Sequence, residues 1–422
     1  MGPAKSRLGD LRARDPSATR LLLGAVDAAL EAVEPTGLVR EALTPAPAGV
    51  LVEGELIPAR RVMLLAFGKA AAGMARGADQ SIGPLISQGL VVTDEAGEVP
   101  GWADLIVAGH PIPDRGSVRG AQAAIALAET LAPDDLLLVL VSGGGSALLE
   151  APAEGLSLDD LRELNDRLLQ SGAPIEVMNH VRRAVSIVKG GRLGERCKSR
   201  LATLVVSDVG SDPAVVASGP TVPPNTPAPD VSEILDSYSI TGLAAERARR
   251  LATTGMGQPP SGPALILADC FTAGAAATRH LAARGLKVSL QSDALDGPAH
   301  ETAVRAIAST KEGEVRVLVG ETTVEVTGTG RGGRNQHAAV AAGIEIAGSG
   351  FRFLAVGTDG VDGPTDAAGG CVDGGTVNDS HSAQRYLDNC DSYSFLEKTG
   401  GLLRIGKTGT NVADLWIVDK SG

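Results

Sequence analysis

The chain has 422 residues, of which 43% are hydrophobic, 21% charged and only 2% aromatic, and its formal net charge is −12. This length corresponds to roughly two or three domains of about 150 residues each, and the acidic balance argues against a nucleic-acid partner, which would need a basic face. The longest apolar runs, such as residues 136–141, are much shorter than the roughly 20 residues of a membrane span. Because the four cysteines form no C-x-x-C pair and no signal-peptide pattern is visible, we expect a cytoplasmic protein without a disulfide framework or a zinc site.

A pattern of apolar runs, glycine-containing turns and alanine-rich helical segments recurs along the chain. A helical segment at 18–35 comes first, and the pattern then occurs at residues 61–78, 136–149 and 263–285. Continuous apolar strands that alternate with helices are typical of parallel sheets covered on both faces. The sequence therefore predicts a doubly wound α/β fold, in which ligands bind at the carboxyl ends of the strands.

Two strand ends in the N-terminal half carry candidate phosphate-binding residues. Lys69 directly follows an apolar strand and precedes a helix, where its charge opposes the helix dipole unless an anion is bound there. Residues 142–146 read Ser-Gly-Gly-Gly-Ser after the next such strand, and glycines allow close approach of an anion to backbone N–H groups. The alternatives are a solvated surface lysine and a simple tight turn.

A basic segment follows at residues 180–195. The spacing of Arg182, Ser186 and Lys189 predicts that the three share one face of a helix. Such a face is either solvated or, if it lines a cleft, suited to binding a substrate carboxylate or phosphate.

Two further strands end in aspartates, Asp208 and Asp359. Carboxylates at strand ends suit Mg²⁺, which binds through one or two carboxylates together with substrate phosphates. Each of these residues could instead stabilise a turn with its own backbone.

Proline-rich stretches at 218–230 and 253–263 are candidate linkers. We therefore expect two domains, residues 1–240 and residues 241–422.

The segment 324–343 is ambiguous. Its glycines satisfy G-x-G-x-x-G at 328–333, between an expected strand at 324–327 and a helix, which is the pattern of dinucleotide-binding loops. Arg331 and Arg334 make the same loop doubly cationic, which suits a transferring phosphoryl group. A glycine-rich structural turn is the third interpretation.

Residues 401–408 satisfy the P-loop pattern G-x-x-x-x-G-K-[ST] letter for letter. A P-loop requires a helix after it to bind phosphate, whereas residues 409–420 read as a turn and a terminal strand. We therefore interpret the match, including Lys407, as accidental.

Together these motifs resemble one family. The segments FGKAAAGMA, GHPIPDRGS, VSGGGSALLEAPAEGLSL, VRRAVSIVKGGRL, GETTVEVTGTGRGGRNQ, GTDGVDGPTDAAG and TGTNVADL, in this order, are similar to those of the class II glycerate kinases. The resemblance covers nearly the whole chain from about residue 18. It implies a Rossmann-like N-terminal domain, a smaller α/β C-terminal domain of the MOFRL type, and an active site in the interdomain cleft.

The activity implied by the resemblance is phosphorylation of D-glycerate at the 2-hydroxyl by ATP with Mg²⁺, giving 2-phosphoglycerate. The family's catalytic lysine corresponds to Lys69, and its catalytic arginine corresponds to Arg334 or Arg331. Arg182 or Lys189 would hold the substrate carboxylate, and Asp208 and Asp359 are candidates for binding Mg²⁺ or for accepting the hydroxyl proton. The residues that would hold substrate or phosphate also include Ser142, Gly143, Gly144, Gly145, Ser146 and Asn335.

The chain departs from the family pattern in three places. His337 stands where the family typically has Glu, Lys407 stands where it often has Pro, and the turn after Asp208 is shorter. The first change leaves the substrate range open, because a nearby ligand contact could differ.

The rival enzyme class is an NAD(P)H-dependent hydroxypyruvate reductase, a label that family members have also carried. A non-enzymatic sugar-acid sensor would need an output module, which we do not find in the sequence. The expected partners are small molecules, with neither nucleic acid nor membrane, and a homodimer is left open.

Overall fold

The computed structural model describes residues 16–224, 230–252 and 257–421, and the chain forms two compact units. One unit is Pro35–Leu267, and the other combines Met1–Glu34 with Ala268–Gly422. The chain thus passes between units at Leu267, whereas linker composition predicts a division near residue 240. Parts of both candidate linkers, residues 225–229 and 253–256, lie outside the described residues.

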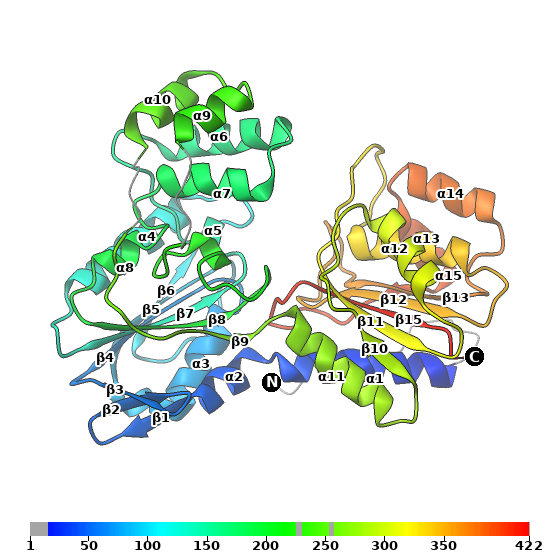
Figure 1. The fold of residues 1–422 in the computed structure, drawn as a ribbon, viewed down its shortest axis with the longest axis horizontal. Coiled ribbons are helices and arrows are strands. Elements are labelled where there is room, and N and C mark those ends of the chain that lie inside the picture. Colours follow the sequence, from blue (N-terminus) through cyan, green and yellow to red (C-terminus); the bar gives the residue numbers. More distant parts are fainter. Residues whose placement is uncertain (1–15, 225–229, 253–256, 422) are drawn as a thin grey trace. The chain divides into compact units, whose positions relative to one another are not determined.

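Residues 231–251 stay with the first unit because they share a core with earlier helices. Leu161, Leu164, Ile234 and Ala245 belong to one buried apolar cluster, and Figure 1 shows the four helices as a group apart from the sheet. These helices are α6 (Leu158–Gln170), α7 (Ile175–Ala184), α9 (Val231–Ser237) and α10 (Leu243–Leu251).

A six-stranded sheet forms the centre of the first unit, in the order β6-β5-β4-β7-β8-β9. The pairings from β6 to β8 are all parallel. Counted along the chain from β4, this is the 3-2-1-4-5-6 order of the Rossmann fold, whose ligands bind where the order reverses. Here that reversal lies between β4 and β7. The strands are β4 (Val62–Phe67), β5 (Ile86–Thr93), β6 (Ala103–Val107), β7 (Leu136–Ser142), β8 (Arg200–Val206) and β9 (Ala264–Ala268).

Helices cover both faces of this sheet. Alternate residues of β4, Met63 and Leu65, share a core with Ala121 and Ala124 of α4 (Arg115–Glu129). The opposite face is covered by α3 (Ala71–Ile82), which contacts β4, β5 and β7. The predicted doubly wound fold is therefore confirmed.

The remaining elements of the first unit are short. They are α2 (Pro35–Ala42), β1 (Leu43–Ala46), β2 (Gly49–Val52), β3 (Glu55–Pro58), η2 (Gly83–Leu85), α5 (Gly145–Leu148), α8 (Arg192–Glu195) and η3 (Val216–Ser218).

The second unit contains a mixed sheet in the order β10-β11-β15-β12-β13-β14. Strands β10 and β11 are parallel, and the other pairs are antiparallel. The strand nearest the C-terminus, β15, lies between β11 and β12 and is buried along its whole length. The strands are β10 (Val288–Leu290), β11 (Val315–Gly320), β12 (Arg352–Gly357), β13 (Gly369–Asp373), β14 (Leu402–Leu403) and β15 (Asp414–Asp419).

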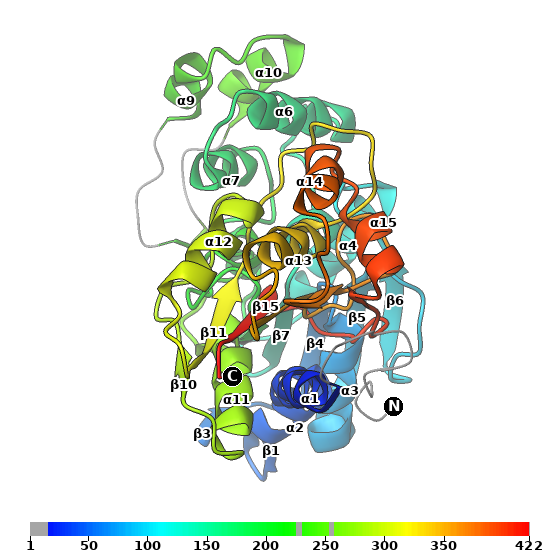
Figure 2. The ribbon, with the colours of Figure 1, turned by 90° about the vertical axis from the view of Figure 1, so that its right-hand side faces the viewer.

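Helices also cover both faces of the mixed sheet, as Figure 2 shows for this unit. On one face Phe353 and Trp416, whose rings meet edge to face at 5.4 Å, share a core with the C-terminal helices. On the other face α11 contacts β10, β11 and β15, and α1 packs along α11. The helices are α1 (Pro16–Ala32), α11 (Cys270–Ala282), α12 (Ala299–Ser309), α13 (Arg334–Glu345), α14 (Ser380–Asp388) and α15 (Ser392–Thr399).

The first helix belongs to this second unit because of its apolar face. Leu22, Leu23, Val26 and Val33 are all buried, at the spacing of one helical stripe. Packing therefore joins the beginning of the chain to its C-terminal half, contrary to the continuous domain 1–240 that the sequence predicts.

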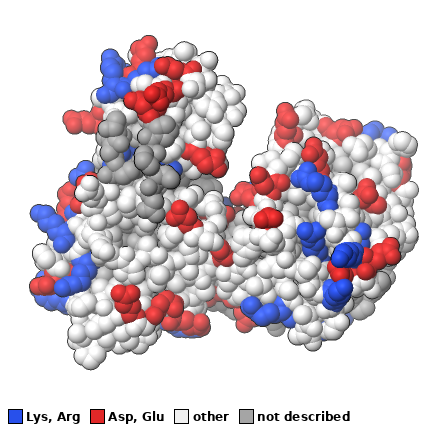
Figure 3. Space-filling view, viewed as in Figure 1, with Lys and Arg blue, Asp and Glu red and all other residues white. Residues whose placement is uncertain are grey.

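The surface matches the acidic composition. On the face drawn in Figure 3, acidic and basic side chains are interspersed over both units. None of the helices in the described ranges has the length and apolar character needed to cross a bilayer.

Candidate active site

The turns after β4 and β7 meet at the edge of the Rossmann sheet where the strand order reverses. The backbone N–H of Lys69 donates to the Gly143 carbonyl at 2.9 Å, and the N–H of Ala70 donates to Ser142 Oγ at 3.0 Å. Gly68 has φ of +117°, and a Cβ there would lie 2.2 Å from Ser142 Oγ. The two predicted phosphate-binding turns are thus joined directly, and the buried Ser142 hydroxyl supports the start of α3.

Gly144 lies at the tip of this junction, between two basic side chains. Its φ is +80°, and a Cβ at this position would lie 3.1 Å from His110 Nε2 and 3.3 Å from Lys69 Cγ. His110 follows β6, which β5 separates from β4, so residues after three strands of the sheet contribute. His110 stands in the GHPIPDRGS segment after a strand, but its residue type and position alone did not predict a role.

The helix after the glycines is short. It covers only Gly145–Leu148, and the Ser146 hydroxyl lies 3.0 Å from the Ser218 hydroxyl. The helical run predicted after the glycines is thus a single short helix, and it packs against η3.

The predicted helical face of Arg182, Ser186 and Lys189 is also wrong, because α7 ends at Ala184. Ser186 instead forms an isolated bridge with Pro152. Because the helix ends before Ser186, the three side chains lie in different environments.

Lys189 lies in the interior and forms an ion pair with Glu150. The lysine is only 1% exposed; burial lowers its pKa, and the Glu150 carboxylate opposes that shift. Arg182 Nε donates to Asn165 at 2.9 Å and its Nη1 donates to Asn179 at 3.2 Å. Arg182 is thus held by amide oxygens, while the charge of Lys189 is compensated internally.

Asp208 follows β8, the neighbour of β7, and is half-buried. It therefore lies at the same sheet edge as Lys69 and the glycine turn, as the topology predicts. In the second unit Asp359 Oδ1 accepts the N–H of Val361 at 3.0 Å, which is the turn-stabilising arrangement that the sequence left open.

No metal centre is preformed in the described parts of the chain, where no group of three or more His, Cys, Asp or Glu is placed to hold an ion. A single carboxylate such as Asp208 or Asp359 still fits Mg²⁺, which commonly takes most of its ligands from phosphate and water.

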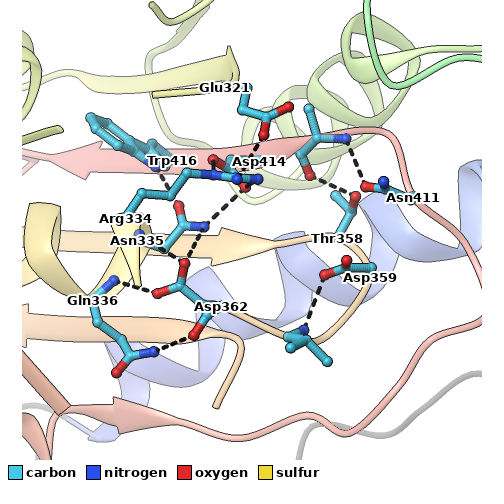
Figure 4. Close-up of polar contacts among 12 residues, drawn as sticks. Glu321, Arg334, Asn335, Gln336, Thr358, Asp359, Asp362, Asn411, Asp414 and Trp416 are labelled. Atoms are coloured by element: carbon cyan, nitrogen blue, oxygen red, sulfur yellow. Dashed lines mark hydrogen bonds and ion pairs between the residues drawn. The ribbon is translucent and has the colours of Figure 1, made fainter. Parts of the chain in front are cut away.

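Arg334 is the centre of a polar network in the second unit (Figure 4). Its Nε and Nη2 donate to the two Asp414 oxygens at 2.6 and 2.9 Å, and Nη1 lies 2.7 Å from Glu321. Burial lowers the pKa of Arg334, but these carboxylates raise it by more, so the net shift is upward. The guanidinium is therefore charged and held in a fixed orientation.

Asn335 connects the same network to the core. Its Nδ2 donates to Asp414 Oδ1 at 2.9 Å, and its Oδ1 accepts from Trp416 Nε1 at 2.7 Å. Burial raises the pKa of Asp414, and Arg334 opposes the shift. Asn335 was predicted as a substrate ligand, and these contacts use its amide to position Asp414.

Asp362 caps helix α13. It accepts the N–H groups of Asn335 at 3.1 Å and of Gln336 at 2.8 Å. Burial raises its pKa to about 6, with the Asp414 charge adding to the shift and backbone hydrogen bonds opposing it. Two N–H groups that could have bound phosphate at this helix start are therefore occupied by a protein carboxyl group.

Arg331 has a different environment. Its guanidinium carbon lies 4.1 Å from the centre of the Tyr393 ring, and Nη2 lies 3.7 Å from Asp366. Its side chain is 50% exposed, compared with 32% for Arg334. The structure thus distinguishes a stacked surface arginine from an anchored one.

The glycines of the 328–333 loop are required by packing. A Cβ on Gly328 would lie 2.3 Å from the Asn389 carbonyl, and one on Gly333 would lie 2.3 Å from Asp362 Cγ. The strand predicted at 324–327 is absent, since β11 ends at Gly320 and residues 324–327 are loop. The context of a dinucleotide-binding loop, a strand leading directly into the glycines, is therefore missing.

This loop lines a pocket of about 420 Å³ together with Arg334, Asp362 and Ser392. Three carboxylates near this pocket received no role from the sequence: Glu321 and Asp362 line the pocket, and Asp414 holds Arg334. Asp414 and Asp362 stand in the quoted motifs TGTNVADL and GTDGVDGP, but their side chains could be assigned only from the fold.

The P-loop pattern at 401–408 folds as expected for an accidental match. Only Leu402–Leu403 form a strand, the described residues 404–413 contain no helix, and β15 follows. Lys407 is exposed.

Residues 21–252 match the family described as a domain of unknown function (DUF4147), and residues 314–414 match the MOFRL family. The D-glycerate 2-kinase of Thermotoga maritima is 38% identical over 96% of this chain and 99% of its own. A putative hydroxypyruvate reductase of Agrobacterium vitis is 35% identical over 95% and 94%. The crystal structure of glycerate kinase from Thermotoga maritima matches with a TM-score of 0.82 and 35% identity, covering 96% of this chain and 99% of that one.

Proposed function

We propose that the chain transfers the γ-phosphoryl group of ATP to the 2-hydroxyl of D-glycerate. The chain matches the DUF4147 and MOFRL families and belongs to the glycerate kinase family. The observation that carries this proposal is the junction of Lys69 with the Gly143–Gly145 turn where the Rossmann strand order reverses. A cation beside a glycine turn at this edge suits an anionic phosphorylated substrate.

Phosphoryl transfer depends mainly on positioning and on electrostatic stabilisation of the transition state. Lys69 would neutralise charge on the phosphate, and backbone N–H groups of the glycine turn would orient it. Ser142 would act indirectly, because its hydroxyl holds the backbone of Ala70.

Arg334 is our preferred catalytic arginine. It lines the 420 Å³ pocket, and its orientation is set by Asp414 and Glu321 before any ligand arrives. Preorganised charges need no reorganisation during the reaction. Arg331 is the second choice, because it stacks on Tyr393 and is more exposed.

The remaining roles follow from charge and location. Arg182 is better placed than Lys189 to hold the substrate carboxylate, because Lys189 is 1% exposed and its ammonium group is directed at Glu150 in the interior. Asp208 or Asp359 would contribute a carboxylate to Mg²⁺, which would neutralise phosphate charge when bound.

A Rossmann strand order also suits NAD(P)H, and the Agrobacterium vitis relative is named a putative hydroxypyruvate reductase. In this chain, however, the first turn of the Rossmann sheet carries Lys69, and the G-x-G-x-x-G pattern lies in the other unit without a preceding strand. These features favour the kinase.

The deciding experiment combines two assays on the same preparation. Release of ADP in the presence of D-glycerate, with the product identified as the 2-phosphate by phosphorus NMR, would support the proposal. Oxidation of NADH by hydroxypyruvate without ADP release would replace it with the reductase.

A further inference from the structure

A second pocket, of about 560 Å³, lies beside the Arg334 pocket within the same unit. It is lined by residues of α12, α13 and α14 and of the 323–327 loop. The two pockets share Thr323, Val324, His337 and Cys390. One extended ligand can therefore occupy both.

His337 is a buried polar side chain that lines both pockets. It is 8% exposed, and among the described residues its ring has no hydrogen-bond partner. Its nearest aromatic neighbour is His300, with ring centres 5.9 Å apart and planes at 76°. A buried imidazole that lines a cavity and has no protein partner is suited to a ligand partner.

The imidazole is neutral at physiological pH, because burial and the neighbouring His300 lower the pKa of His337 to about 4. A neutral imidazole has one nitrogen that donates and one that accepts. It can therefore form hydrogen bonds with a neutral ligand that carries both kinds of group.

The rest of the lining restricts the ligand further. Val304, Val324 and Ile344 provide apolar surface, which suits the faces of a planar ring. The carboxylates of the second pocket disfavour any anion and can accept hydrogen bonds from amino groups; they are Glu301, Glu325, Glu345 and Asp388.

We propose that this second pocket binds the nitrogen heterocycle of the nucleotide, with His337 hydrogen-bonded to the edge of the base and the phosphates in the adjoining Arg334 pocket. The division follows from charge: among the described residues, four carboxylates and no lysine or arginine line the second pocket, whereas Arg334 lines the first, together with Glu321 and Asp362. This inference rests on the proposed kinase function and adds to it the location of the base.

The probe is adenosine, which carries the base without phosphate. Isothermal titration calorimetry should show that His337→Ala weakens adenosine binding at least about tenfold, the scale of one lost hydrogen bond to a buried group. His337→Gln should restore part of the affinity, because its amide both donates and accepts. In histidine-selective NMR spectra, adenosine should shift the ring signals of His337 and His300.

Two further variants guard against effects on folding. Val304 is 37% exposed on α12, so Val304→Trp should fill the pocket and weaken adenosine binding without disturbing the core. His381→Ala, an exposed histidine of α14, is the matched control and should bind adenosine like the wild type. Inorganic tripolyphosphate should bind equally to wild type and to His337→Ala.

The proposal is overturned if adenosine does not bind the wild type, or if Val304→Trp binds it with unchanged affinity. Unchanged affinity in His337→Ala would remove His337 from the site. Failure of the kinase function is a separate result, namely adenosine binding at this pocket without ADP release in the presence of D-glycerate.

Discussion

The Asp414 carboxylate holds the guanidinium of Arg334 through two hydrogen bonds, 2.6 Å from Nε and 2.9 Å from Nη2. Asp414→Asn removes the charge and one of the two acceptors, so Arg334 should lose its fixed orientation. We expect kcat to fall about tenfold or more. Steady-state kinetics with D-glycerate and ATP measure the effect.

Asp419 provides a matched control at the other end of β15. It pairs with Arg352 at 2.9 Å and is 2% exposed. Asp419→Asn should lower the free energy of unfolding by an amount similar to that of Asp414→Asn, about 1–3 kcal/mol, and leave kcat near the wild-type value. Equal losses of kcat in both variants would show that the effect comes from general disturbance of the strand.

Lys69→Ala should lower turnover at least about a hundredfold, because it removes a charge from the junction of the two turns. Lys407→Ala is the control, since Lys407 belongs to the accidental P-loop match and should change turnover less than about tenfold. Near-normal activity of Lys69→Ala would show that Lys69 is a solvated surface lysine without a role in catalysis. A loss of about a thousandfold in a folded Lys407→Ala protein would contradict our interpretation of residues 401–408.

The two arginines of the glycine loop can be separated by the same assay. Arg334→Ala should cost at least about a hundredfold in turnover. Arg331→Ala should cost less, because its side chain is half exposed and stacks on Tyr393. A greater loss in Arg331→Ala would reverse our choice of catalytic arginine.

Asp362 should make stability depend on pH. Its pKa is raised from 3.8 to about 6 by burial, so the folded chain binds a proton that the unfolded chain has already lost. Proton binding to Asp362 therefore adds to the free energy of unfolding at low pH, and this contribution is lost as the pH rises from about 4 to about 6. The total change is about 3 kcal/mol.

Denaturant unfolding of wild type and Asp362→Asn at several pH values measures this effect. The free energy of unfolding of wild type, relative to the variant, should decrease across the window and remain constant above about pH 7. An increase with pH would mean that the hydrogen bonds from Asn335 and Gln336 outweigh burial and lower the pKa.

Local patterns in the sequence predicted the central parallel strands of the first unit. Apolar runs at 62–67 and 136–141, each followed by a glycine turn and a helix, predict parallel strands, and the structure confirms them. The same patterns locate Lys69 and residues 142–146 at strand ends. Backbone periodicity and turn chemistry act over a few residues, and they can therefore be read directly from the sequence.

Tertiary packing decided the rest. Lys189 pairs with Glu150 inside the core rather than extending α7, the valines at 324–326 lie in a loop, and α1 packs with the C-terminal unit. Arg334 depends on Asp414, which lies 80 residues away along the chain. Such pairings are governed by the burial of charge and by the close packing of distant segments, and local periodicity carries no information about either.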